Sequence, residues 1–104
     1  MKFSQFLKEQ WPELQQAIVT DTSDQRPHKQ QPLAEKVKFA IPHDPKCHEK
    51  IDKAVRAWVE KIGAIVSSND WYTITYQDKS YELSWSWTAA GLKIETSYIP
   101  PGDP

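Results

Sequence analysis

The sequence predicts an α+β fold, a two-layer sandwich in which two amphipathic helices cover one face of a C-terminal, three-stranded antiparallel meander. Apolar residues recur every three or four positions in two stretches and alternate with polar residues in three later ones. A chain of 104 residues also suffices for one compact core. We therefore expect a single domain over 1–104, with an exposed loop over 20–32 and an extended tail over 99–104.

The composition excludes several classes of protein. Aromatic residues make up 12% of the chain, which is too many for a disordered tail. The net charge is −1, so the positive excess of most nucleic-acid-binding domains is missing. No apolar run reaches the roughly 20 residues of a membrane helix, and Cys47 is the only cysteine, so no internal disulfide can form. We expect a cytoplasmic protein that does not associate with membranes.

The first amphipathic stretch predicts a helix over about 4–19 with Ser4 as its N-cap. Pro12 disfavours helical backbone angles in the residue before it, so we expect a kink or a restart at this point. One face of the helix would carry the apolar residues Phe3, Leu7, Trp11, Leu14 and Ile18.

Residues 33–41 fit two interpretations. Val37, Phe39 and Ile41 alternate with other residues as in a strand, whereas Leu33, Val37 and Ile41 also have the spacing of one helix face. The bulk of the alternating side chains favours a strand. We therefore expect a short fourth strand near 36–41, at the edge of the sheet.

The second amphipathic stretch predicts a helix from Pro45 to about Val66. Asp44 is a suitable N-cap, and proline is favoured at the first helical position. Polar residues over 67–70 then end the helix. Its apolar stripe consists of Ile51, Val55, Trp58, Ile62 and Ile65.

The last third of the chain predicts three strands, because large residues alternate with smaller polar ones over 71–77, 81–87 and 92–98. A two-residue turn at Asp78 and Lys79 would pair Tyr76 with Tyr81, Ile74 with Leu83, and Tyr72 with Trp85. A four-residue loop at 88–91 would pair Trp87 with Leu92, Trp85 with Ile94, and Tyr81 with Tyr98. Both registers place the large side chains on one face, against the helices, and leave the other face polar.

The sequence offers little for catalysis or metal binding. His43, Cys47 and His48 lie close together in the chain, but Cys47 and His48 are adjacent and would point apart on a helix. A zinc site needs four converging ligands, and no third group orients a catalytic base beside the thiol. Glycine-rich phosphate-binding motifs do not occur. We expect no catalytic residue, no metal and no cofactor.

The polar face of the meander is the predicted binding site. If Tyr72 faces the core, Trp71 points outwards among hydroxyl side chains, like an interface hot spot inside a polar rim. The strands over 70–104 contain more acidic than basic residues, which favours a basic protein as the partner and argues against nucleic acid on this sheet. The residues expected to contact the partner are Trp71, Thr73, Thr75, Glu82, Ser84, Ser86 and Glu95.

These observations predict a small non-catalytic interaction module of the inhibitor, immunity or adaptor type, either a monomer or a homodimer. Two alternatives stay open. One is a ligand-binding domain or enzyme with an aromatic pocket between sheet and helices and with Cys47 or His48 at its rim. The other is a homodimeric structural module that pairs through its open sheet.

Overall fold

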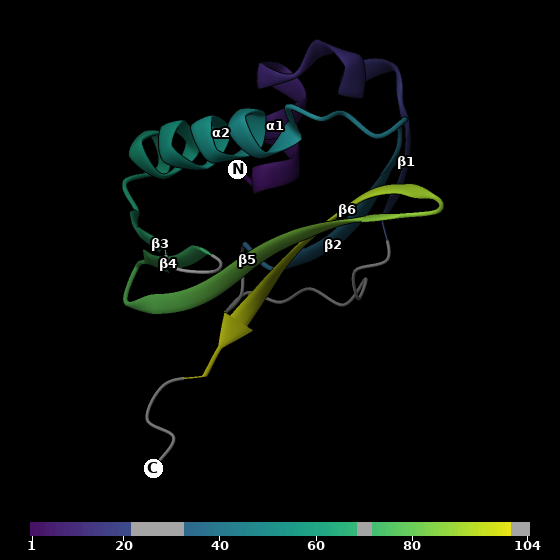
Figure 1. Ribbon diagram of the computed structural model, residues 1–104. Coiled ribbons are helices and arrows are strands. Elements are labelled where there is room, and N and C mark those ends of the chain that lie inside the picture. The colour runs from purple at the N-terminus through teal and green to yellow at the C-terminus, as the bar shows by residue number, and fades with distance from the viewer. Residues whose placement is uncertain (22–32, 69–71, 101–104) are drawn as a thin grey trace.

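The computed structural model describes residues 1–21, 33–68 and 72–100 and shows one antiparallel sheet of six strands with both α-helices on the same side of it (Figure 1). The elements in chain order are α1 (Phe3–Gln10), the 3-10 helix η1 (Pro12–Gln16), β1 (Ile18–Asp21), β2 (Glu35–Ala40), α2 (Cys47–Ile62), β3 (Ile65–Ser68), β4 (Tyr72–Tyr76), β5 (Lys79–Thr88) and β6 (Gly91–Ile99). The strands are arranged in the order β1-β2-β6-β5-β4-β3. The predicted α+β class is therefore confirmed, whereas the predicted number of strands is wrong.

The N-terminal segment forms two separate helices, as the position of Pro12 predicts. Trp11 adopts extended backbone angles (φ −128°, ψ 91°) at the end of α1, and Pro12 takes the first position of η1. Ser4 is not the N-cap, because Lys2 holds that position. Ser4 lies inside α1 instead, where its N–H and its hydroxyl both donate hydrogen bonds to the Glu35 carboxylate.

The helical part of the N-terminal segment ends at Gln16, earlier than the apolar spacing predicts. Ala17 has extended backbone angles (φ −76°, ψ 149°), and the next four residues form β1, antiparallel to β2. The expected helix to Val19 and the expected loop at residues 20 and 21 are therefore wrong. The rest of that loop, 22–32, lies outside the described residues.

The strand favoured for 36–41 is confirmed as β2, but its place in the sheet differs from the expected one. β2 pairs with β1 on one side and with β6 on the other, so it lies inside the sheet and not at its edge. Its burial alternates, with Glu35, Val37 and Phe39 buried. β2 therefore contributes to the core on one face and adds side chains to the other face.

α2 begins at Cys47 and ends at Ile62, so the predicted helix Pro45–Val66 is too long at both ends. Gly63 ends the helix in the left-handed conformation (φ 75°) that glycine adopts most readily. The N–H of Ala64 then donates to a carbonyl of the last helical turn at 2.8 Å. This turn directs the chain towards the sheet.

β3 follows directly, at a place where the sequence pattern indicated only the end of a helix. Ile65 pairs with Thr75, and Val66 pairs with Ile74, in an antiparallel register. Val66 packs against the core, whereas the side chain of Ile65 is 71% exposed. Ile65, the last residue of the predicted helical stripe, and Val66, the predicted end of the helix, therefore lie on opposite faces of a strand.

The hairpin between β4 and β5 has a different register from the predicted one. Gln77 and Asp78 form its turn, and both have positive φ angles (51° and 64°), as a type I′ turn requires. The pairs are Tyr76 with Lys79, Ile74 with Tyr81, and Tyr72 with Leu83. The predicted turn at Asp78 and Lys79 is wrong, but the shift is by two residues and the same side chains still face the helices.

The register predicted between β5 and β6 is confirmed. Trp87 pairs with Leu92, Trp85 with Ile94, and Tyr81 with Tyr98. Thr88 and Gly91 also pair, so the connection is shorter than the four-residue loop expected. Gly91 has a φ of 129°, and a Cβ atom added to it would lie 2.1 Å from the carbonyl oxygen of Phe39. Only glycine fits at this approach of β6 to β2.

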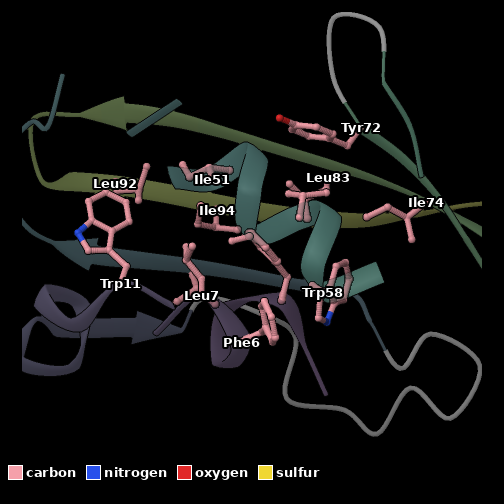
Figure 2. Close-up of a cluster of buried hydrophobic side chains, with 14 of the residues drawn as sticks. Phe6, Leu7, Trp11, Ile51, Trp58, Tyr72, Ile74, Leu83, Leu92 and Ile94 are labelled. Atoms are coloured by element: carbon pink, nitrogen blue, oxygen red, sulfur yellow. The ribbon is translucent and has the colours of Figure 1, made fainter. Parts of the chain in front are cut away.

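The hydrophobic core fills the layer between the helices and the sheet (Figure 2). Side chains from α1, α2 and the central strands point towards one another in this layer. Trp11, which the sequence places on the apolar face of the first helix, is 3% exposed and belongs to the core. The fully buried side chains with the largest volumes are Trp58, Tyr81, Phe3, Phe39, Leu7 and Leu14.

Candidate functional site

The face of the sheet that points away from α1 and α2 is the first candidate site, and we call it the open face. Within residues 1–21, 33–68 and 72–100, no helix packs on this face. The strand registers assign to it the following side chains: Ile18, Thr20, Lys36, Lys38, Ala40, Ile65, Ser67, Thr73, Thr75, Ser80, Glu82, Ser84, Ser86, Lys93, Glu95 and Ser97.

Six of the seven predicted contact residues share this open face. Thr73 and Thr75 belong to β4, and Glu95 belongs to β6, while β5 contributes Glu82, Ser84 and Ser86. Opposite neighbours in a sheet have Cβ atoms about 5 Å apart, and Glu82 has such neighbours in Thr73 and Ser97. Trp71, the expected centre of the site, lies outside the described residues.

The charge on the open face differs from the acidic charge that the sequence of the meander predicts. β2 adds Lys36 and Lys38 to the face, so the described open face carries three lysines against two glutamates. Lys36 forms an ion pair with Glu95 at 3.4 Å. The expectation failed because it counted only the C-terminal strands, whereas Lys36 and Lys38 come from β2, which precedes α2.

Lys38 and Lys93 form an unusual pair on this face, because they lie directly opposite each other on β2 and β6. Like charges in this position destabilise a sheet. The next neighbours in the same row are hydroxyl residues, Thr20 on β1 and Ser86 on β5. Among the described residues neither lysine forms an ion pair, and the row therefore presents two ammonium groups between two hydroxyls.

Two exposed isoleucines mark opposite edges of the open face. Ile18 on β1 is 76% exposed and Ile65 on β3 is 71% exposed. The sequence pattern missed both, because it placed each of them on the apolar stripe of a helix. Large apolar side chains at this exposure are available for contact with another molecule.

The histidine and cysteine residues near the start of α2 pack against tryptophans of the covered face. The His43 and Trp87 rings lie 4.9 Å apart, and the His48 and Trp85 rings 6.0 Å apart. The indole Nε1 of Trp87 donates a hydrogen bond to the Cys47 sulfur at 3.0 Å. In the described part of the chain, no group of three or more metal-ligating side chains comes together.

A cavity of about 380 Å³ is the second candidate site. It lies where η1 and Ala17 face the segment that connects β2 to α2, and its lining residues are Trp11, Glu13, Gln16, Ala17, Ala40, Ile41, Pro42, His43, Asp44 and Pro45. The alternative pocket expected from the sequence had Cys47 or His48 at its rim. Neither residue lines this cavity.

Lys50 joins the two sides of this cavity. Its Nζ lies 2.6 Å from Asp44 Oδ2, 3.7 Å from Glu13 Oε2 and 4.7 Å from the centre of the Trp11 ring. The Trp11 indole N–H also donates to Glu13 Oε2. The hydrogen bond from Lys50 lowers the pKa of Asp44, and the backbone N–H of Lys46 adds to this effect. The same hydrogen bond raises the pKa of Lys50.

Two further carboxylates have structural partners. Glu35 is 4% exposed, and its oxygens accept hydrogen bonds from the N–H and the hydroxyl of Ser4 at 2.9 and 2.6 Å. Asp52 accepts a hydrogen bond from the Tyr72 hydroxyl at 2.8 Å, which lowers the pKa of this aspartate. Burial, together with the nearby carboxylate, raises the pKa of Tyr72 to about 12.

Comparison of the chain with protein-family models, with curated proteins and with solved structures found no match. Among the described helices, none has the length and apolar character that crossing a membrane requires. The open face and the cavity are therefore the features of the molecule that bear on its function.

Proposed function

We propose that this protein is a non-catalytic module that binds another protein through the open face of its sheet. The observation that carries the proposal is the contrast between the two faces. One face is covered by α1 and α2, while the other presents hydroxyls, five charged groups and two exposed isoleucines without a covering helix in the described part of the chain.

The side chains near the middle of the open face suit an interface. Threonine and serine lose little rotamer entropy when they become ordered, and each hydroxyl can both donate and accept a hydrogen bond. Thr73, Ser84 and Ser86 are of this kind. Ile18 and Ile65 add apolar area at the edges. A partner that spans the sheet would therefore bury apolar surface and pair polar groups in one contact.

The charges on the open face favour an acidic group on the partner, in place of the basic partner expected from the sequence. A carboxylate placed between Lys38 and Lys93 would offset the repulsion between these two ammonium groups. Glu95 already has Lys36 beside it. Complementary charge of this kind also speeds the encounter of two proteins and makes it depend on salt.

The experiment is affinity capture from the native host, followed by binding measurements with the captured protein after purification. The double variant Lys38→Glu and Lys93→Glu should weaken binding about tenfold or more, because it replaces attraction by repulsion. Lys53→Glu, on the exposed side of α2, is the matched control and should bind like the wild type. Melting temperatures of all three proteins should agree to within a few degrees.

Equal loss of binding in the double variant and in the α2 control would overturn the proposal, and so would full binding by the double variant. Sedimentation over a range of protein concentrations tests whether the partner is a second copy of this chain. A dimer that the double variant disrupts would identify the partner as a second copy of this chain and would contradict the proposal of a different protein.

A further inference from the structure

The cavity beside η1 shares only Ala40 with the open face, and its lining combines apolar walls with two carboxylates. Ala17, Ile41 and Pro42 provide apolar surface, while Glu13 and Asp44 provide the carboxylates. Binding sites for small molecules typically have this composition, with apolar walls and a few polar groups that fix the orientation of the ligand. Its volume of about 380 Å³ is within the range of such sites.

The cavity wall already holds one ammonium group. Three lining residues surround the Nζ of Lys50. It lies 4.7 Å from the centre of the Trp11 ring, 3.7 Å from Glu13 Oε2 and 2.6 Å from Asp44 Oδ2. An aromatic ring together with carboxylates is an arrangement that binds cations, because the face of the ring and the carboxylates all carry negative charge density. Lys50 therefore shows which kind of head group this wall accepts.

Glu13 is the carboxylate that is available to a second cation. Asp44 lies 2.6 Å from Lys50 and is also influenced by the charge of Lys46, whereas the Glu13 side chain is 70% exposed and lies 3.7 Å from Lys50. Glu13 Oε2 accepts the Trp11 indole N–H and lies near Lys50, whereas Oε1 accepts no hydrogen bond from any residue that the structure describes. An anionic ligand would meet these two carboxylates, so the site favours a cation over an anion.

We propose that this cavity binds a primary alkylammonium group. The ammonium is held by Glu13 beside Lys50, and the alkyl chain lies against Ile41 and Pro42. The group can belong to a small free amine or to a lysine side chain of a peptide, because both present the same ammonium on a short apolar chain. The proposal is independent of the open face, which uses none of these residues.

The test uses n-pentylammonium as the probe, with pentanol and pentanoate as neutral and anionic probes of similar length. Binding is followed by the NMR signal of the Trp11 indole N–H, assigned through Trp11→Phe. We expect saturable binding of n-pentylammonium that is about fivefold or more tighter than that of pentanol, since hydrogen bonds to charged groups are the stronger ones. Pentanoate should not bind.

Three variants test the geometry. Glu13→Gln should weaken binding of the ammonium probe about fivefold while leaving pentanol unchanged. Ala17→Leu should fill the cavity and weaken both probes. Lys50→Met should strengthen binding of the ammonium probe, because it removes the ammonium group that lies beside both carboxylates. Glu49→Gln, exposed on α2, is the control and should change neither affinity.

Lysine with an acetylated α-amine and a methylamide at its carboxyl group distinguishes the two sources of the ligand. If this compound binds as tightly as n-pentylammonium, the site accepts a lysine side chain; if only n-pentylammonium binds, the ligand is a small free amine. Both results support an alkylammonium site. Equal affinities for the ammonium and neutral probes, or no effect of Glu13→Gln on folded protein, would overturn it.

Discussion

Glu35 shows how one buried charge connects two distant parts of the chain. It lies on β2, yet its oxygens accept the N–H and hydroxyl of Ser4 in the first turn of α1. A carboxylate is favourable at a helix N-terminus, where N–H groups lack partners within the helix. The sequence pattern assigned Ser4 to this capping role. In the structure Glu35 accepts the hydrogen bonds at the start of α1. The local spacing of residues around Ser4 could not have indicated a partner so far along the chain.

Tyr72 and Asp52 provide a test at the level of single residues. Burial, together with the Asp52 carboxylate that accepts its hydroxyl, raises the pKa of Tyr72 from its ordinary value of 10.0 to about 12. Because the pKa is higher in the folded protein, the stability that this tyrosine contributes is complete below pH 10 and is lost as the pH rises through about 12.

We predict that Asp52→Asn lowers the pKa of Tyr72, because it removes the negative charge while leaving the burial. Titration of tyrosinate absorbance measures this change, with Tyr72→Phe assigning the signal. Glu49→Gln, on the same helix but away from the ring, should leave the titration unchanged. An unaltered Tyr72 midpoint in Asp52→Asn would show that the carboxylate does not act on this hydroxyl.

At the scale of the elements, Pro12 and Gly63 show where the predicted helix boundaries were right and where they were wrong. Pro12 correctly predicted the division between α1 and η1. The end of α2 was placed too late, because Ile65 has the spacing of its apolar stripe and conceals the effect of Gly63. Periodicity alone cannot distinguish a short strand from the last turn of a helix when the strand has only four residues, as β1 and β3 have.

The two described glycines with positive φ angles should respond differently to substitution. Gly63→Ala should cost about 1 kcal/mol of unfolding free energy, because only the left-handed backbone opposes it and no atom lies within 4 Å of the added Cβ. Gly91→Ala should cost at least about twice as much, because its Cβ would clash with the Phe39 carbonyl 2.1 Å away.

Urea unfolding of both variants measures these free energies. Ala89→Gly, in the exposed turn before Gly91, is a control for substitution at this hairpin and should have a small effect. Equal costs at Gly63 and Gly91 would mean that the contact between β6 and β2 is looser than the structure shows.

At the scale of the whole molecule, the sequence predicted the covered face better than the open one. The alternation of large residues on β5 and β6 indicated which side faces the helices, and the β5–β6 register was correct. The pairing of β2 with β6 joins segments separated by the entire α2 and three strands, so local patterns could not reveal it. The places of Lys36 and Lys38 on the open face and the cavity beside η1 depend on such long-range contacts and were missed for that reason.

The two faces of the sheet should differ sharply in their sensitivity to substitution. Ile74→Ala removes a fully buried side chain and should lower the free energy of unfolding by about 2–5 kcal/mol. Ile65→Ala, on the adjacent strand, should change the free energy of unfolding by less than about 0.5 kcal/mol. Chemical denaturation compares the two variants directly. A large cost for Ile65→Ala would show that the open face is already covered in the isolated protein.

The position of β2 between β1 and β6 also bears on how the chain folds during synthesis. β3, β4, β5 and β6 follow one another and pair with their immediate neighbours, so this half can assemble from local contacts as it leaves the ribosome. β1 and β2 are made first but must wait for β6, the final strand, before they join the main sheet. The N-terminal half therefore completes its structure last, although it is synthesised first.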